Sequence, residues 1–165
     1  MDGVVHSNVC LAKKCKPFAI EFVVRGYMTG STSTSIWTAY NSGKRVYCGH
    51  QLEDGMIKNQ KLSKIICTPT TKSDVHDMPL SGKEVVEGNH MTQEQWDFCE
   101  SKALALFKFG QAEAAKRDFI LVDTKYEFGI DQATGEILLI DEIHTPDSSR
   151  YWIKSTYDQR MARGE

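Results

Sequence analysis

The amino-acid sequence predicts an α+β fold in which an antiparallel sheet packs against helices. Residues 18–25 and 121–129 alternate between apolar and polar side chains, and this alternation is typical of strands. A turn separates the second stretch from the apolar run at residues 137–140, so these two segments predict a hairpin. Residues 92–117 instead repeat apolar side chains at helical spacing and predict one long helix.

The remaining elements can be assigned in chain order. The strand at residues 18–25 places four residues on one face: Ala19, Glu21, Val23 and Arg25. Gly26 and Gly30 are expected to end this strand, and residues 30–35 predict a flexible, hydroxyl-rich linker. Residues 37–40 and 45–47 predict a second hairpin, and residues 80–90 predict a loop.

The long helix has a clear start and a clear buried side. Thr92 and Gln95 have the spacing of a capping box, which predicts that the helix begins there. One stripe of apolar residues is expected to join the core: Trp96, Cys99, Ala103, Leu106 and Phe107.

The hairpin at residues 121–140 carries a concentrated set of charges. Alternation places Asp123, Lys125 and Glu127 on one face of its first strand. If residues 131–135 form a five-residue loop, the opposing pairs are Ile130 with Glu136, Glu127 with Leu139 and Lys125 with Asp141. Glu127 and Asp141 are then diagonal neighbours whose carboxylates can share one cation, and hard oxygen ligands suit Mg²⁺. A solvated sheet face would show the same alternation and stays the alternative.

A loop rich in anion-binding groups follows at residues 145–150. Its hydroxyl groups can donate hydrogen bonds to phosphate oxygens, and the planar guanidinium of Arg150 can donate two parallel ones. Asp147 can orient that guanidinium. An ordinary turn capped by Asp and Ser has the same composition, so spacing alone does not decide between the two interpretations.

Composition limits the class of protein. The 165 residues, 41% hydrophobic and 25% charged, fit one globular domain or a large part of a bigger protein. A formal net charge of −2 provides no overall basic field, so nucleic acid is not expected as a partner. No apolar run approaches the roughly 20 residues of a membrane span, and no membrane contact is expected. The five cysteines include no CxxC pair, which argues against a disulfide framework and a cysteine zinc site.

Four segments of the chain resemble the SAICAR synthetase family of purine biosynthesis. LVDTKYEFG at residues 121–129 and LLIDEIHTPDSSRYW at residues 138–152 resemble the two signature motifs of the family. IEFVVRGYMTGS at residues 20–31 resembles the segment after its hinge, and TPTTKSDVHD at residues 68–77 resembles its central loop. The resemblance implies a SAICAR synthetase-like fold, related in layout to ATP-grasp and kinase-like folds.

The resemblance also implies a reaction. The family joins L-aspartate to carboxyaminoimidazole ribotide through an acyl phosphate, with ATP and Mg²⁺, and releases SAICAR, ADP and phosphate. The expected cofactor-binding residues are Glu21, Glu127 and Asp141, of which Glu127 and Asp141 are the expected Mg²⁺ ligands.

The other expected roles also follow from the resemblance. Lys125 is expected to steady the phosphate or the activated carboxylate, and Asp123 to orient Lys125 or to receive a proton. Arg25 has an alternative role as a structural ion-pair partner of Glu21. The expected substrate-binding residues are Arg25, Ser31, Lys72, Asp77, Asp147, Ser149 and Arg150.

The chain also departs from the family pattern. Residues 1–165 match the central and C-terminal catalytic region as a single unit, whereas the upstream nucleotide-binding lobe and the closing helices of the family are expected to be missing. No GxxxxGK or GxGxxG phosphate-binding motif occurs in the sequence. We therefore expect weak or no activity from these residues alone.

Two other functions stay open at this point. The alternative is a catalytically weak or inactive ribotide-binding or subunit-interaction module. A generic kinase-like phosphotransferase is disfavoured because HRD and DFG motifs do not occur. A cytoplasmic location is expected, or a plastid if a transit peptide precedes this segment. The sequence leaves the oligomeric state open, a homo-oligomer included.

Overall fold

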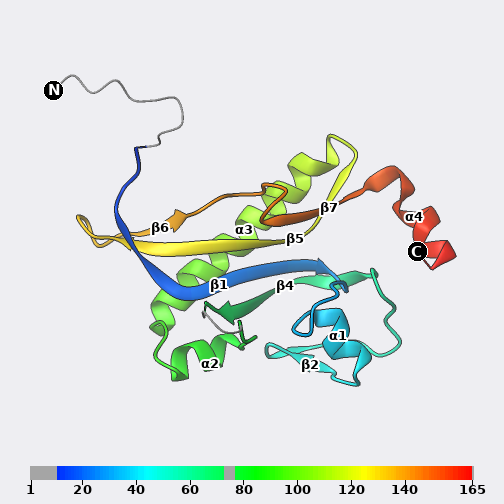
Figure 1. The fold of residues 1–165 in the computed structure, drawn as a ribbon, viewed down its shortest axis with the longest axis horizontal. Helices are drawn as coiled ribbons and strands as arrows, with labels where there is room; N and C mark the ends of the chain where they lie inside the picture. Colours follow the sequence, from blue (N-terminus) through cyan, green and yellow to red (C-terminus); the bar gives the residue numbers. More distant parts are fainter. Residues whose placement is uncertain (1–10, 73–76, 165) are drawn as a thin grey trace.

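The structure, a computed structural model, describes residues 11–72 and 77–164 of the chain. Its main sheet has five strands, which are β1 (Cys15–Tyr27), β4 (Lys61–Thr71), β5 (Phe119–Asp131), β6 (Ile137–Ile140) and β7 (Ser149–Ile153). They pair antiparallel in the order β4-β1-β5-β6, and β7 also pairs with β5. β6 and β7 lie one after the other along the same edge of β5, as Figure 1 shows. The expected α+β fold with an antiparallel sheet is confirmed.

The long helix α3 (Gln93–Ala115) lies behind the sheet in Figure 1 and covers one of its faces. Together with α2 (Gly82–Glu87) it encloses the main hydrophobic core, in which the rings of Phe22 and Trp96 stack 5.3 Å apart. The predicted helix and its capping box at Thr92 and Gln95 are confirmed. In the predicted stripe, Leu106 is partly buried. The other four residues are buried: Trp96, Cys99, Ala103 and Phe107.

A smaller group of elements lies at the end of the sheet where β1 finishes (Figure 1). It contains α1 (Ile36–Asn41) and the short hairpin of β2 (Val46–Tyr47) and β3 (His50–Gln51). These elements enclose a second core made of Met28, Ile36, Ala39, Tyr40, Tyr47, Leu52, Met56, Leu62 and Ile66. The helix α4 (Lys154–Arg163) follows β7 and reaches the same end, where the Tyr157 hydroxyl donates to the Asn59 carbonyl oxygen at 2.8 Å.

Several local expectations are wrong. Residues 37–40 belong to α1 and not to a hairpin, because the Ser35 hydroxyl caps a helix by accepting from the Thr38 N–H at 3.3 Å. Residues 80–90 contain α2 and not only a loop, because Ser81 and Glu84 form a second capping box. The strand at residues 18–25 is confirmed, but it continues past Gly26 through an irregularity in its pairing with β4.

The register of β5 against β6 differs by one residue from the expectation. Glu127 lies opposite Ile140 and not Leu139. The connecting loop has the expected five residues but lies one position later, at residues 132–136, because β5 extends to Asp131. The Asp131 N–H donates to the Glu136 carbonyl oxygen at 2.8 Å, and the Gly135 N–H donates to the Asp131 carbonyl oxygen at 2.8 Å. Gly135 has a φ of +78°, which glycine adopts without strain. A one-residue shift turns paired side chains to the other face, but Asp141 lies beyond the last pair and has a φ of +65°.

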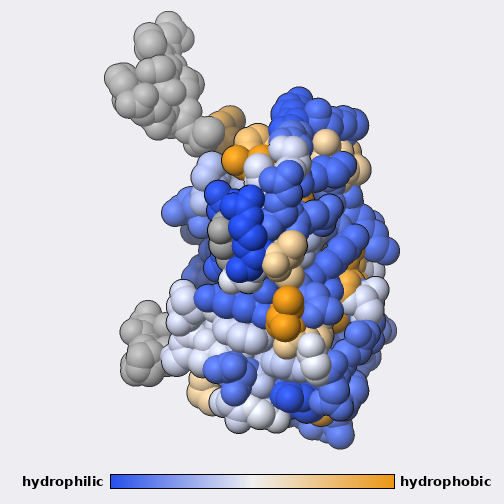
Figure 2. Space-filling model, turned by 90° about the vertical axis from the view of Figure 1, so that its right-hand side faces the viewer, coloured by the Kyte–Doolittle hydropathy of each residue, from blue (hydrophilic) through white to orange (hydrophobic). Residues whose placement is uncertain are grey.

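The surface at the α4 end of the molecule is mostly hydrophilic, with apolar residues in small separate areas (Figure 2). Within residues 11–72 and 77–164, no helix is both long enough and apolar enough to cross a membrane.

Replacing Thr92 with Ala is expected to lower the free energy of unfolding by about 1 kcal/mol. The Thr92 hydroxyl accepts a hydrogen bond from the Gln95 N–H at 3.2 Å, and Ala leaves this N–H without its acceptor. Urea denaturation measures the change. Ser101→Ala, at an exposed position of the same helix, is the control and should change the free energy by less than about 0.5 kcal/mol. Equal losses in the two variants would contradict a capping role.

Candidate functional site

The sheet face that points away from α3 carries a group of charged side chains, named here the charged face. In β1 and β5 the even-numbered residues Phe22, Val24, Tyr126 and Phe128 enter the core, so their odd-numbered neighbours point to the opposite side. The antiparallel register places Glu21 beside Glu127 and Arg25 beside Asp123. The charged face consists of Glu21, Arg25, Lys72, Asp123, Lys125, Glu127, Asp141 and Arg150.

Burial separates this face from an ordinary solvated sheet surface. Asp123 is 7% exposed and Glu127 is 5% exposed, although both are acidic. Ionised carboxylates are rarely buried to this extent unless cations compensate their charge. The structure supplies those cations in two adjacent clusters.

The lysine cluster joins three carboxylates to one ammonium group. Lys125 Nζ lies 2.7 Å from Glu127 Oε1, 3.3 Å from Asp141 Oδ2 and 3.5 Å from Glu21 Oε1. Lys72 Nζ approaches the other oxygen of Glu127 at 2.6 Å. Glu127 is therefore held between two lysines, and Lys125 compensates the repulsion between Glu127 and Glu21, which face each other across β1 and β5.

The pKa values in the lysine cluster reflect this arrangement. Burial raises the pKa of Glu21 above its usual range, and Lys125 partly opposes that effect. Burial alone would lower the pKa of Lys125, but its hydrogen bonds to Glu127 and Asp141 and the charge of Glu21 raise it. Lys125 is thus a permanently charged group at neutral pH and is suited to binding an anion.

The arginine cluster joins two guanidinium groups to one carboxylate. Asp123 Oδ2 accepts from Arg150 Nη1 at 2.7 Å and from Arg25 Nη1 at 3.3 Å. Arg25 also donates from Nε to the hydroxyl of the buried Thr68 at 3.0 Å. Each guanidinium carries five N–H donors, which is more than Asp123 can accept, so the pair can also bind an anion. Asp123 contacts these arginines, whereas the sequence-based expectation was that it orients Lys125 or receives a proton.

Arg25 is not the ion-pair partner of Glu21. Its guanidinium pairs with Asp123, and Glu21 pairs with Lys125. The alternative structural role that the sequence allowed for Arg25 is therefore replaced by membership of the arginine cluster.

The donor set of the lysine cluster fits Mg²⁺ in its chemistry. Glu127 and Asp141 contact the same ammonium group, so their carboxylates are close enough to bind one cation together. Within residues 11–72 and 77–164, no group of three His, Cys, Asp or Glu side chains has the arrangement of a metal site. Mg²⁺ commonly takes only one or two protein carboxylates and completes its coordination with phosphate oxygens and water. Glu127 and Asp141 are therefore sufficient as partial ligands.

The other expected site residues are less closely connected. The Ser149 hydroxyl lies 2.7 Å from Thr124 Oγ1, and Thr124 and Asp123 point to opposite faces of β5. Ser149 and Arg150 therefore do not form one anion-binding pair. Ser31 and Asp147 are exposed at the surface. Asp77 is exposed as well, and its charge contributes to the raised pKa of Glu21. Residues 73–76 of the same segment lie outside the described residues.

Thr68 is a site residue that the sequence analysis does not identify. Its hydroxyl accepts from Arg25 Nε and donates to the Val23 carbonyl oxygen at 3.0 Å, so it fixes the guanidinium against β1. A β-branched run at residues 65–71 was the available signal for a strand there, and β4 covers it.

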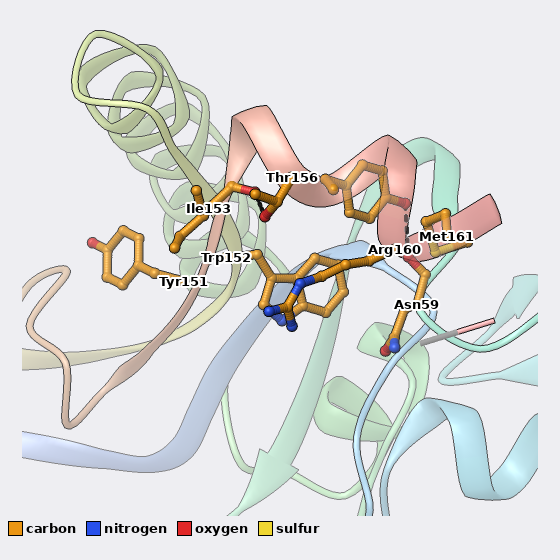
Figure 3. Close-up of a pocket in the computed structure, with 8 residues that line it drawn as sticks. Asn59, Tyr151, Trp152, Ile153, Thr156, Arg160 and Met161 are labelled. Atoms are coloured by element: carbon orange, nitrogen blue, oxygen red, sulfur yellow. Dashed lines mark hydrogen bonds between the residues drawn. The ribbon is translucent and has the colours of Figure 1, made fainter. Parts of the chain in front are cut away.

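A separate pocket of about 270 Å³ lies between β7 and α4 (Figure 3). Its lining is mainly aromatic and apolar and shares no residue with the charged face: Asn59, Tyr151, Trp152, Ile153, Thr156, Tyr157, Arg160 and Met161. This pocket is therefore separate from the ion-paired clusters of the charged face.

Glu21 and Glu84 should change the pH dependence of stability in opposite directions. Because burial raises the pKa of Glu21 above 4.5, its stabilising contribution is present below pH 4.5 and is lost as the pH rises through the folded value. Hydrogen bonds from Ser81 lower the pKa of Glu84 below 4.5, so its contribution is present above pH 4.5 and is lost as the pH falls through the folded value.

Urea unfolding between about pH 3 and about pH 7 tests this pair. The quantity compared is the free energy of unfolding of the wild type minus that of the variant. With rising pH this difference should fall for Glu21→Gln and should rise for Glu84→Gln. Slopes of the same sign would contradict the assignment.

Comparison with known proteins identifies the family. A sequence model of the SAICAR synthetase family matches residues 3–164. The chloroplastic phosphoribosylaminoimidazole-succinocarboxamide synthase of Arabidopsis thaliana is 61% identical over 157 residues, which are 95% of this chain and 38% of the plant protein. The phosphoribosylaminoimidazole-succinocarboxamide synthase of Legionella pneumophila (strain Lens) is 57% identical over 163 residues, which are 99% of this chain and 52% of the bacterial protein.

A solved structure agrees with these sequence relatives. SAICAR-synthase from Saccharomyces cerevisiae, complexed with SAICAR, has a TM-score of 0.74 and 31% identity, covering 91% of this chain and 52% of the yeast chain. This chain thus spans about half or less of the length of the relatives it matches. The match to the family model extends over nearly all of its residues, and the chain belongs to the SAICAR synthetase family.

Proposed function

We propose that the charged face is the metal- and substrate-binding part of an ATP-dependent amide ligase. The ligase joins L-aspartate to carboxyaminoimidazole ribotide and forms SAICAR, ADP and phosphate. Family membership supports this proposal, and so does the complex of the yeast relative with SAICAR. The observation that carries it is the convergence of Arg25 and Arg150 on Asp123, directly beside the lysine cluster.

The two clusters suit two parts of this chemistry. A carboxylate is a poor acyl donor, and conversion to an acyl phosphate requires that the negative charge of both reacting groups be compensated. Lys125 and Lys72 provide that compensation from one side. Glu127 and Asp141 would hold Mg²⁺, with Glu21 beside them, and the bound ion would neutralise phosphate oxygens.

The arginine cluster is the proposed ribotide-binding part. Planar guanidinium groups bind phosphate or carboxylate with two parallel hydrogen bonds. Asp123 holds both guanidinium groups in place and is therefore a positioning residue in this proposal, in place of the acid-base role that the resemblance implied. Ser31, Lys72, Asp77 and Asp147 are proposed to complete the substrate contacts, whereas Ser149 faces the other side of the sheet beside Thr124 and supports β7.

An aspartate-dependent assay of ADP release tests the ligase, and calorimetry with the ribotide measures binding separately. Lys125→Met should abolish ADP release but leave ribotide binding within about threefold, because Lys125 does not belong to the arginine cluster. Lys64→Met, at an exposed position of β4, is the control and should leave both unchanged. Turnover of about 1 per second or more is typical of enzymes.

The two measurements distinguish the remaining alternatives. Ribotide binding without ADP release would contradict ligase activity in this chain and favour a binding module. If the wild-type chain shows neither ADP release nor ribotide binding, the assignment of the charged face to this reaction is contradicted.

A further inference from the structure

The segment between β6 and β7, residues 141–148, connects the two clusters of the charged face and is named here the linking loop. Its first residue, Asp141, contacts Lys125 at 3.3 Å. Two residues after its end, Arg150 contacts Asp123 at 2.7 Å. The path of this loop therefore sets where one residue of each cluster lies.

His144 lies in the middle of the linking loop and points away from the charged face. Its Nε2 atom lies 2.5 Å from the Tyr126 hydroxyl, and Tyr126 belongs to the core on the α3 side of the sheet. The two rings meet edge to face with centroids 5.6 Å apart. The His144 carbonyl oxygen also accepts from the Tyr151 hydroxyl at 2.7 Å.

Helix α3 provides the space that the His144 ring occupies. A Cβ atom added at Gly110 would lie 2.4 Å from His144 Cε1 and 2.8 Å from Leu121 Cδ2, so the His144 ring would have to move away from the helix. Gly110 thus allows the ring to lie directly against the helix backbone. A pocket of about 500 Å³ lies beside the ring, so neighbouring side chains do not enclose the ring completely. The position of the ring therefore depends on its hydrogen bond to Tyr126.

The backbone of the linking loop also departs from ordinary geometry. Asp141 has a φ of +65° and His144 a φ of +57°, values that cost free energy in residues other than glycine. Such conformations persist where surrounding contacts impose them. At His144, those contacts are the hydrogen bonds to Tyr126 and Tyr151 and the close approach to Gly110.

We infer that His144 is a positioning residue, which holds Asp141 and Arg150 in place through its contacts with Tyr126 and Gly110. It touches neither cluster and acts through the backbone of the linking loop. The inference rests on the proposed function for its effect on ligands. Its effect on the loop is independent of that function, because the Lys125 N–H donates to the Ser148 carbonyl oxygen at 3.1 Å and reports the docking of the loop on β5.

Hydrogen exchange at the Lys125 amide tests the effect on the loop. His144→Ala should accelerate this exchange at least tenfold relative to exchange at amides of α3. Ile143→Ala is the matched control, because Ile143 is the neighbouring residue and is 45% exposed, and it should leave the exchange unchanged. Unchanged exchange in His144→Ala would overturn the inference.

Ligand affinities test the effect on the clusters in the same full chain. The Kd values for carboxyaminoimidazole ribotide and for Mn²⁺, used as a paramagnetic probe of the Mg²⁺ site, should each rise about tenfold in His144→Ala and Tyr126→Phe. His144→Gln keeps a side-chain amide that can hydrogen-bond to the Tyr126 hydroxyl and should recover most of both affinities. The double variant His144→Ala with Tyr126→Phe should bind both ligands with the same affinity as either single variant, because the two residues act as one unit.

The outcomes separate this inference from the proposed function. Faster exchange with unchanged affinities would overturn the positioning role and leave a purely structural one. If the wild-type chain binds neither ligand, the proposed function fails, and the exchange experiment still decides whether His144 positions the loop.

Discussion

Asp123→Asn should lower the free energy of unfolding by about 3 kcal/mol, the low end of the range for breaking a buried ion pair. Asp123 accepts from two guanidinium groups and is 7% exposed. The amide that replaces it carries no charge, so Arg25 and Arg150 would repel each other. The side chain of Arg25 is only 12% exposed and cannot easily reach water, whereas that of Arg150 is 43% exposed and can.

Urea denaturation measures this loss, and calorimetry should show ribotide binding weakened by at least about 100-fold, because both guanidinium groups lose their common anchor. Asp54→Asn is the matched control. Asp54 also pairs with an arginine, Arg45, at 2.8 Å, but its side chain is 91% exposed. Asp54→Asn should lower the free energy of unfolding by less than about 1 kcal/mol. Similar losses in the two variants would contradict the buried character of the arginine cluster.

Asp141→Asn should weaken Mg²⁺-dependent ADP binding by at least about 100-fold. Removing a residue that only hydrogen-bonds to a metal ligand typically has a smaller effect. An amide oxygen is a weaker ligand for a hard cation than a carboxylate, and Glu127 alone would remain of the two proposed ligands. The fold should be retained. The Asp141 side chain is 45% exposed, and Asn adopts its φ of +65° more readily than most residues.

Titration of ADP with and without Mg²⁺ measures this effect, and urea denaturation should show a change below about 1 kcal/mol. Glu136→Gln is the control, because Glu136 is an exposed carboxylate in the turn of the same hairpin. Identical titration curves for the wild type and Asp141→Asn would remove Asp141 from the metal site.

Local sequence periodicity was sufficient to predict the part of the lysine cluster that lies in the hairpin, whereas Glu21 and Lys72 join it through strand pairing. Alternation in a strand has a fixed period of two, so Lys125 and Glu127 had to share one face of β5. The expected register of the hairpin was wrong by one residue, because a hydrogen bond from the Asp131 N–H to the Glu136 carbonyl oxygen moves the turn one position later in the chain. Asp141 nevertheless contacts Lys125 as the sequence predicted, since it lies past the paired residues and the lysine side chain is long.

The arginine cluster could not be predicted in the same way. Arg25 and Asp123 are separated by 98 positions, and their contact depends on the pairing of β1 with β5. Arg150 reaches Asp123 only because β7 pairs with β5, and residues 145–150 resemble a loop when they are considered alone. The short helices α1 and α2 were missed for a related reason, because six residues contain too few turns to show a helical period.

The charged face has equal numbers of opposite charges. Four cationic side chains are paired there with four carboxylates. Such a surface is close to electroneutral and attracts distant anions only weakly. At the lysine cluster, an incoming phosphate would have to share Lys125 or Lys72 with their carboxylates, and the charge of these carboxylates would then be compensated less completely.

A divalent cation restores that balance when it binds the released carboxylate. Anion and metal binding should therefore be thermodynamically linked, and each ligand should increase the affinity of the other by the same factor. The equal pairing of charges would thus make the empty face stable and would favour simultaneous occupation by nucleotide phosphate and metal over occupation by either one alone.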